Sequence, residues 1–201
     1  MKVNGALFEH GRTVIGGLKD ATGQGAPDPG EAFDRAQRAF DDVNDTLKSA
    51  APTGWHGPGS YTYADQNTRQ QLRSEAMAGA DREVYRVLRR EADQIALCRG
   101  HLDDQSQFLA DTSAASPLHG APRYGEAMKL AVEMTALQSA LGESCYRLNL
   151  LRSEVAQNAA ELQQAVGRYA GVADAAGLPH VSVRDTFDAC DPVVLPARDG
   201  R

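Results

Sequence analysis

Aromatic residues are scarce in this chain of 201 residues, at 6% of the sequence, although 42% of the residues are hydrophobic. A chain of this length can bury roughly 70% of its unfolded surface, which is enough for one domain, or one domain plus tails. With so few rings, the interior must be filled by Leu, Ala, Val and Met, which favours helices over a β-sandwich. The composition therefore predicts an all-α fold.

Cysteine is also sparse: Cys98, Cys145 and Cys190 form no CxxC pair and no Cys/His ligand spacing. An odd count argues against a disulfide framework, and the spacing argues against a zinc site. If two helices folded back about Leu118, Cys98 would face roughly residue 138, out of register for a bond to Cys145. We expect no disulfide between these two cysteines, no metal ligands and no cofactor.

The sequence also has no long apolar run and no excess of basic residues over acidic ones. No segment approaches the roughly 18 apolar residues of a membrane span, and Glu9, His10 and Arg12 interrupt the apolar stretch that a Sec signal peptide needs. The net charge of -6 is spread along the chain, which disfavours attraction to phosphate backbones. We expect no stable membrane span, no Sec signal peptide and no nucleic-acid partner.

Residues 1–26 are Gly-rich and contain a short amphipathic stretch around Ile15, which predicts a short, weak helix packed on a larger element. A helical hairpin is predicted over residues 27–115. Asp28 is suited to cap its first helix, and a second, longer helix is expected from about Ser60 to Thr112. The first helix has apolar residues three and four positions apart, at Phe33, Ala36, Phe40, Val43 and Leu47.

The clearest periodicity lies in residues 116–175, where a third long amphipathic helix is expected from about Tyr124 to Val172. Its apolar seam, interrupted by Ser144 and Asn158, predicts coiled-coil-like packing on the hairpin or on a partner. The seam comprises Met134, Leu137, Leu141, Leu148, Leu151, Val155 and Leu162. Residues 176–201 predict an irregular tail. Short connections between long helices predict an elongated bundle with antiparallel neighbours.

Trp55 is the only tryptophan, and it lies in the Trp55-His56-Gly57 turn between the two helices of the hairpin. The simplest interpretation is that the indole plugs the end of the bundle while Gly57 adopts a backbone conformation that other residues avoid. Such a plug at a hairpin tip can also serve as an export signal. Tyr61 and Asp65 follow directly with YxxxD spacing, one helical turn apart.

A helix, a WxG turn and a second helix resemble the WxG superfamily of type VII (ESX) secretion substrates, and the surroundings are similar to the mycobacterial EspA/EspE family. The similarity spans roughly residues 10 to 115. It is carried by Pro27-Asp28-Pro29-Gly30, the helix with Phe33 and Phe40, Gly54-Trp55-His56-Gly57, Tyr63-Ala64-Asp65-Gln66-Asn67 and Ala80-Asp81-Arg82-Glu83-Val84.

The resemblance implies a secretion substrate or effector, cytoplasmic before export and then secreted or associated with the cell envelope. It also implies that Trp55 and Gly57 form the secretion motif, that Tyr61 and Asp65 are a weak second signal, and that a helical protein or secretion chaperone is the partner. A homo-oligomer is possible. The alternative is a cytoplasmic coiled-coil adaptor or self-assembling scaffold, which the third-helix seam alone would support.

An enzyme is the least favoured class. The chain contains no GxSxG, HExxH or P-loop sequence. His101, Asp103 and Asp104 could be imagined as metal ligands, but no second His or Glu is near enough to complete a site, and a solvated helix face explains them better. We expect a non-enzymatic protein without catalytic residues.

Overall fold

The computed structural model describes residues 6–115 and 124–175, and these are helical apart from two connections. The four helices are α1 (Ala6–Asp20), α2 (Glu31–Ser49), α3 (Pro58–Ala115) and α4 (Tyr124–Ala175). No strand occurs within the described ranges, so the all-α prediction is confirmed. The irregular tail expected over residues 176–201 lies outside the described residues.

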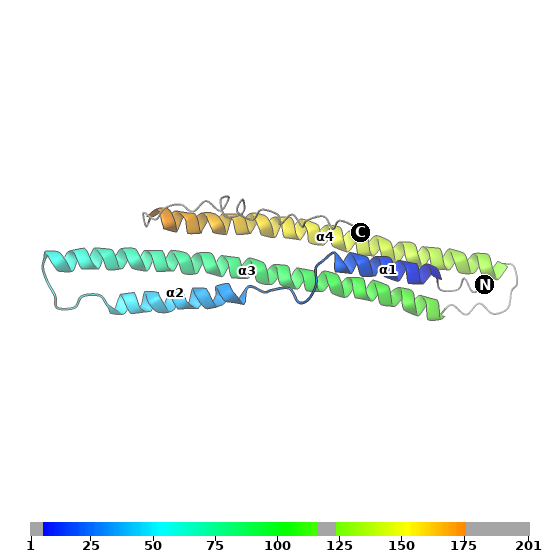
Figure 1. Cartoon of the computed structure of the whole chain (residues 1–201), viewed down its shortest axis with the longest axis horizontal. Helices are drawn as coiled ribbons and strands as arrows, with labels where there is room; N and C mark the ends of the chain where they lie inside the picture. The colour runs from blue at the N-terminus through cyan, green and yellow to red at the C-terminus, as the bar shows by residue number, and fades with distance from the viewer. Residues whose placement is uncertain (1–5, 116–123, 176–201) are drawn as a thin grey trace, which may run out of the picture.

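Helix α3 forms the spine of an elongated molecule, as expected from the helix lengths (Figure 1). Helix α2 packs antiparallel on its first half, and α4 packs antiparallel along most of its length. Helix α1 contacts both α3 and α4 near the opposite end, whereas α2 contacts α3 alone among the described helices. The molecule therefore has three packed helices at one end and a two-helix hairpin tip at the other.

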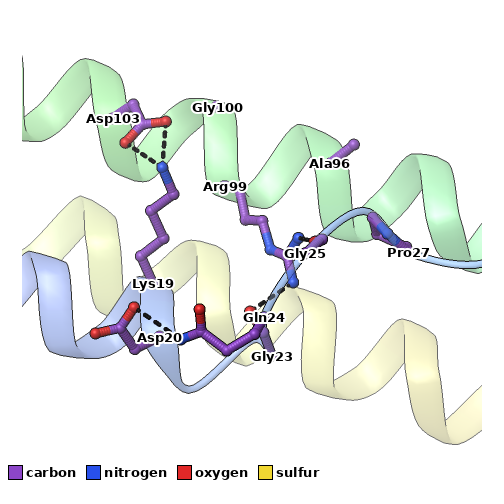
Figure 2. A pocket seen from close by; sticks show the side chains of 10 residues that line it. All are labelled: Lys19, Asp20, Gly23, Gln24, Gly25, Pro27, Ala96, Arg99, Gly100 and Asp103. Carbon is purple, nitrogen blue, oxygen red and sulfur yellow. Dashed lines mark hydrogen bonds and ion pairs between the residues drawn. The ribbon is translucent and has the colours of Figure 1, made fainter.

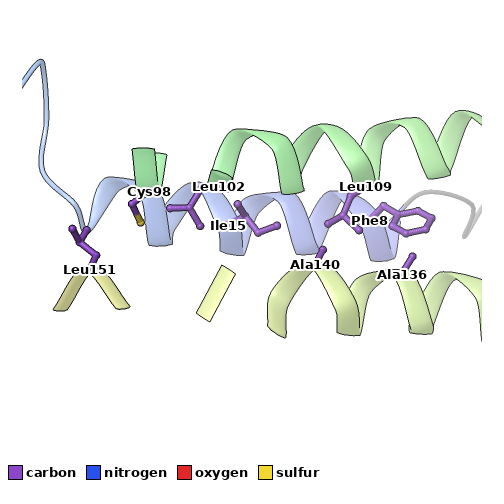
Figure 3. Packing of buried hydrophobic residues seen from close by; sticks show 8 residues of the cluster. All are labelled: Phe8, Ile15, Cys98, Leu102, Leu109, Ala136, Ala140 and Leu151. Atoms are coloured by element: carbon purple, nitrogen blue, oxygen red, sulfur yellow. The ribbon is translucent and has the colours of Figure 1, made fainter. Parts of the chain in front are cut away.

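The main hydrophobic core lies where α1, α3 and α4 meet (Figure 3). It contains Phe8, Ile15, Cys98, Leu102, Leu109, Ala136, Ala140 and Leu151. Phe8 and Ile15 of α1 are almost fully buried. The helix predicted in the Gly-rich segment is α1, a helix of 15 residues that packs on α3 and α4 and supplies two of the largest core side chains.

Gly11 explains why a Gly-rich helix packs so well at this position. A Cβ atom built on Gly11 would lie 2.3 Å from Cδ1 of Leu137 and 3.1 Å from Cδ1 of Leu109. The missing side chain thus lets the backbone of α1 approach α3 and α4 closely. Glycine, which indicates a broken helix when the sequence is considered alone, serves close helix packing in the fold.

The start of α2 differs from the prediction. Asp28 does not cap the helix: its carboxylate accepts a 2.9 Å hydrogen bond from the N–H of Gly30, and α2 begins at Glu31 with Gly30 as its N-cap. Gly30 has φ 77°, and a Cβ there would lie 2.8 Å from Cδ1 of Leu88. The helix therefore begins where a left-handed glycine can lie directly against α3.

The register of α3 against α4 also differs from the prediction. Cys98 lies in the same core cluster as Leu151, not opposite residue 138. The prediction assumed that the two helices fold back symmetrically about Leu118. In the structure, the start of α4 extends beyond the end of α3 (Figure 1). Cys98, which is buried, and Cys145, which is exposed, are both free in the structure.

Candidate functional site

The connection between α2 and α3 is shaped by glycine and by one buried hydroxyl. Gly54 and Gly57 have φ values of 80° and 126°, which residues with side chains rarely adopt. The carbonyl of Gly57 accepts hydrogen bonds from the N–H groups of Ser60 and Tyr61, at 3.0 and 3.3 Å. The buried Ser60 hydroxyl donates to the carbonyl of Trp55 at 2.9 Å. The turn is thus fixed to the first turn of α3.

Trp55 lies on the outside of this turn, with 52% of its surface exposed. Its ring is 6.0 Å from that of Tyr63, centroid to centroid, at an interplanar angle of 49°. A Cβ on Gly59 would come within 3.3 Å of Trp55 Cζ2, so the indole also lies against the start of α3. The prediction of a buried plug is therefore wrong. Trp55 and Tyr63 form a half-exposed aromatic pair.

Polar side chains hold the two helices beneath this tip together. Asn67 donates from Nδ2 to the carbonyl of Leu47 at 2.9 Å, and Ser74 donates from Oγ to the carbonyl of Phe40 at 2.7 Å. Each bond joins a buried α3 side chain to the α2 backbone. Because both donors are buried, breaking either bond would leave a desolvated polar group unpaired. The hairpin therefore supports the aromatic pair rigidly.

Tyr61 and Asp65 are both exposed on the first turns of α3. The carboxylate of Asp65 pairs with Arg69 at 2.9 Å, one turn further along. Two residues along an α-helix correspond to a rotation of about 200°, so Tyr61 and Tyr63 project from different sides of α3. The structure therefore brings Trp55 together with Tyr63, and the Tyr61/Asp65 pair forms a separate surface. Tyr63 was not among the predicted site residues.

The seam predicted on the third helix lies largely inside the chain. Leu151 belongs to the core cluster, and Leu137, Leu141, Leu148 and Val155 pack against it. Leu162 is half-buried, whereas Met134 is exposed. Because α1 and α3 cover most of this face, a partner that binds the folded chain must use another surface.

Asn158 interrupts the seam and anchors a polar layer between α3 and α4. Its Oδ1 accepts hydrogen bonds from Arg90 at 3.0 and 2.7 Å, and its Nδ2 donates to Gln94 at 2.8 Å. Arg90 also pairs with Glu161 at 2.8 Å. A fully paired polar group in an apolar interface penalises every other register, because a shift would leave it desolvated and unpaired. The periodicity of the seam identified Asn158 as an interruption, but it did not identify Arg90 and Gln94 as its partners.

Tyr169 and Asp81 form a second buried contact between α4 and α3. The phenol donates to Oδ1 of Asp81, and the other carboxylate oxygen is buried without a hydrogen-bond partner. Burial of the phenol, together with its hydrogen bond to the Asp81 carboxylate, raises the pKa of Tyr169 far above its ordinary value. The folded chain therefore keeps this phenol protonated at a pH where an exposed tyrosine ionises.

Alkaline titration should reveal this tyrosine. Below about pH 10, the ordinary pKa of tyrosine, folded and unfolded chains both hold the proton. At higher pH only the folded chain holds it, so the contribution of Tyr169 to stability falls as pH rises. In a tyrosinate absorbance titration, Tyr169→Phe should remove an ionisation step that lies above the ordinary range of tyrosine, whereas Tyr61→Phe, the control at an exposed position, should leave that step in place. Loss of an early step in Tyr169→Phe would contradict this assignment.

A polar recess lies where the connection after α1 crosses α3 (Figure 2). Arg99 donates to the carbonyls of Thr22 and Gly23 at 2.9 and 2.7 Å, and also to the carbonyl of Gly25. Lys19 pairs with Asp103 at 2.7 Å across the same recess. The donors of Arg99 are thus occupied by the chain's own backbone, so the recess anchors α1 to α3.

From the sequence, His101, Asp103 and Asp104 are better explained as a solvated helix face than as metal ligands. In the structure Asp103 is the ion-pair partner of Lys19. Within residues 6–115 and 124–175, no group of three or more His, Cys, Asp or Glu residues is placed to hold a metal ion. Over the same ranges, no helix is both long enough and apolar enough to cross a membrane.

These features define a class of protein: an elongated helical bundle whose antiparallel hairpin presents a tryptophan at its tip. A family model described as the EspA/EspE family matches residues 22–104, which include α2, the turn and most of α3. Over these residues the chain is therefore similar to the EspA/EspE family, and the resemblance inferred from the sequence is confirmed.

Two relatives give the same result. The ESX-1 secretion-associated protein EspE of Mycolicibacterium smegmatis is 38% identical over 169 residues, which cover 83% of this chain and 32% of that protein. The protein of the same name from Mycobacterium tuberculosis is 30% identical over 88 residues, covering 43% of this chain and 22% of that protein. The match thus spans about a third or less of each relative's length. No solved structure matches the chain.

Proposed function

We propose that this chain is a type VII (ESX) secretion substrate or effector that acts as a non-enzymatic helical interaction or structural protein. The observation that carries the proposal is the half-exposed Trp55–Tyr63 pair at the hairpin tip. Large aromatic side chains on a rigid support are typical anchors of protein recognition, because a partner buries much apolar area at little entropic cost. Both relatives are named as ESX-1 secretion-associated proteins, which supports secretion as the process.

The polar groups that join the helices support a binding role over catalysis. Asn158, Arg99 and Asn67 each use their donors to join one helix to another segment. Their hydrogen bonds stabilise helix packing, and Arg99, although it lines the polar recess, uses its donors to hold the segment after α1. Recognition would instead proceed by helix packing against a helical protein or secretion chaperone. We propose a cytoplasmic state before export and a secreted or envelope-associated state afterwards.

Export can be tested directly with the full chain carrying an epitope tag. It would be expressed in mycobacterial strains with and without a working ESX core, and filtrate and lysate would be blotted beside a cytosolic marker that reports lysis. We expect the protein in the filtrate of the ESX-competent strain alone. Release from the ESX-deficient strain would refute the proposal. Retention in both lysates would also refute it and favour the cytoplasmic adaptor or scaffold.

A further inference from the structure

Four large apolar side chains remain exposed on one face of α4: Met128, Val132, Tyr146 and Leu150. At 100° per residue, their spacings of about 4, 14 and 4 positions place all four within roughly 40° of one another. The seam residues Leu137, Leu141 and Leu148 pack on the core. The exposed face is thus a second apolar surface of the same helix, and α1, α2 and α3 do not bury it.

The order of these residues is symmetric about Ser139. Met128 and Leu150 each lie 11 positions from Ser139, and Val132 and Tyr146 each lie 7 positions from it. If a second copy of α4 packed antiparallel on the first with the two Ser139 residues opposite each other, Met128 would oppose Leu150 and Val132 would oppose Tyr146. Each of these pairs would occur twice. This self-complementary pattern is what a twofold contact between identical chains requires.

The centre of the face is suited to close helix approach. Thr135, Ser139 and Gly142 are small, and a Cβ on Gly142 would meet nothing within 4 Å. Beside them Phe108 of α3 is partly exposed and lines an apolar groove together with Met128 and Val132 of α4. Small residues at a crossing point let two helices approach closely, while the larger ones on either side interdigitate.

We infer that this face binds a second copy of the chain, through an antiparallel α4–α4 contact centred on Ser139. The helices would overlap over roughly 33 Å at 1.5 Å per residue. The four α4 side chains and Phe108 expose roughly 500 Å² per copy, so the contact would bury about 1,000 Å², near the lower limit for specific interfaces. A reversible dimer with a Kd of about 1–100 μM is therefore expected. The inference is independent of the export proposal.

Sedimentation equilibrium of the purified full chain tests the inference across the same range of roughly 1–100 μM. Val132→Glu introduces two charges into a twofold contact, because Val132 occurs twice, and it should weaken dimerisation at least about tenfold. Val166→Glu is the matched control, since Val166 is 48% exposed against 53% for Val132 but lies about 160° away around α4. We expect Val166→Glu to dimerise like the unchanged chain.

A cross-link tests the register. In a background with Cys145→Ser and Cys190→Ser, Ser139→Cys should form a covalent dimer on oxidation, because two copies of residue 139 meet at the twofold axis. Ser153→Cys, at an exposed position on the same face but away from the axis, should not. Burial raises the pKa of the Cys98 thiol, which keeps it protonated and slow to oxidise.

Three results would overturn the inference. A wild-type chain that stays monomeric throughout the range would mean that no second copy covers this face, whether or not another protein does. Equal weakening by Val132→Glu and Val166→Glu would place the contact elsewhere. Equal cross-linking of Ser139→Cys and Ser153→Cys would exclude the proposed register. None of these results depends on whether the chain is exported.

Discussion

Replacing Trp55 by alanine is expected to reduce ESX-dependent export at least about tenfold while changing the free energy of unfolding by about 1 kcal/mol or less. Trp55 is half-exposed, so the folded chain gains only part of the stabilisation that a buried ring would give. A binding partner would bury the remaining surface, and loss of such an anchor costs about 2 kcal/mol or more, roughly thirtyfold in affinity. The ratio of filtrate to lysate signal and thermal denaturation measure the two effects.

Two further variants show whether the aromatic surface itself is recognised. Trp55→Phe keeps a ring beside Tyr63 and should retain part of the export. Leu72→Ala removes an exposed apolar side chain of α3 away from the tip and should be exported normally. Normal export of Trp55→Ala would show that the tip is not a signal. Equal loss in Trp55→Ala and Leu72→Ala would show a general sensitivity of export to surface changes.

The exposure of Trp55 could not be predicted from the sequence, because it depends on where α4 ends. Helix α4 ends at Ala175, whose carbonyl accepts a 3.1 Å hydrogen bond from Arg73. The start of α3 extends beyond the end of α4 and packs on α2 (Figure 1). An end with two helices has no interior in which an indole could be enclosed. The WxG spacing identifies the turn, whereas burial depends on a helix about 100 residues away.

Periodicity predicted most of the fold because each helix carries its buried face in its own sequence. The seam residues from Leu137 to Val155 are three or four positions apart, and they do pack on the core. The register of α3 against α4 is determined in another way. It is fixed by pairs such as Arg90 with Asn158, which are 68 residues apart, and their pairing is not encoded in any local spacing. The fold-back point inferred from the connecting loop was wrong for this reason.

The glycines of the first segment concealed how well its helix packs. Gly11 and its neighbours lower the helix propensity of the first segment, and propensity alone predicts a weak helix. In the structure Phe8 and Ile15, seven residues apart, occupy one face of α1 and are buried between α3 and α4. Tertiary packing therefore outweighs the local cost of glycine, and the apolar spacing on either side of Gly11 was the signal that could have shown it.

Leu102→Ala is expected to destabilise the chain by about 3 kcal/mol, because it removes a fully buried side chain and leaves a cavity. Leu102 is 0% exposed and lies in the core cluster with Ile15 of α1 (Figure 3). For a chain of this size, the loss corresponds to a decrease in Tm of roughly 6–12 °C. Net stabilities are about 5–15 kcal/mol, so the effect would be a large fraction of the total. Thermal or denaturant unfolding measures it.

Leu97→Ala is the matched control, since the same substitution is made in the same helix at a residue that is 63% exposed. It should change stability by about 0.5 kcal/mol or less, because little apolar surface is lost and helix propensity changes equally in both variants. Equal destabilisation by the two would contradict the placement of the core. Because Leu102 lies in the core with α1 and Trp55 lies at the hairpin tip, the Leu102→Ala chain that remains folded should still be exported, which separates loss of stability from loss of the export surface.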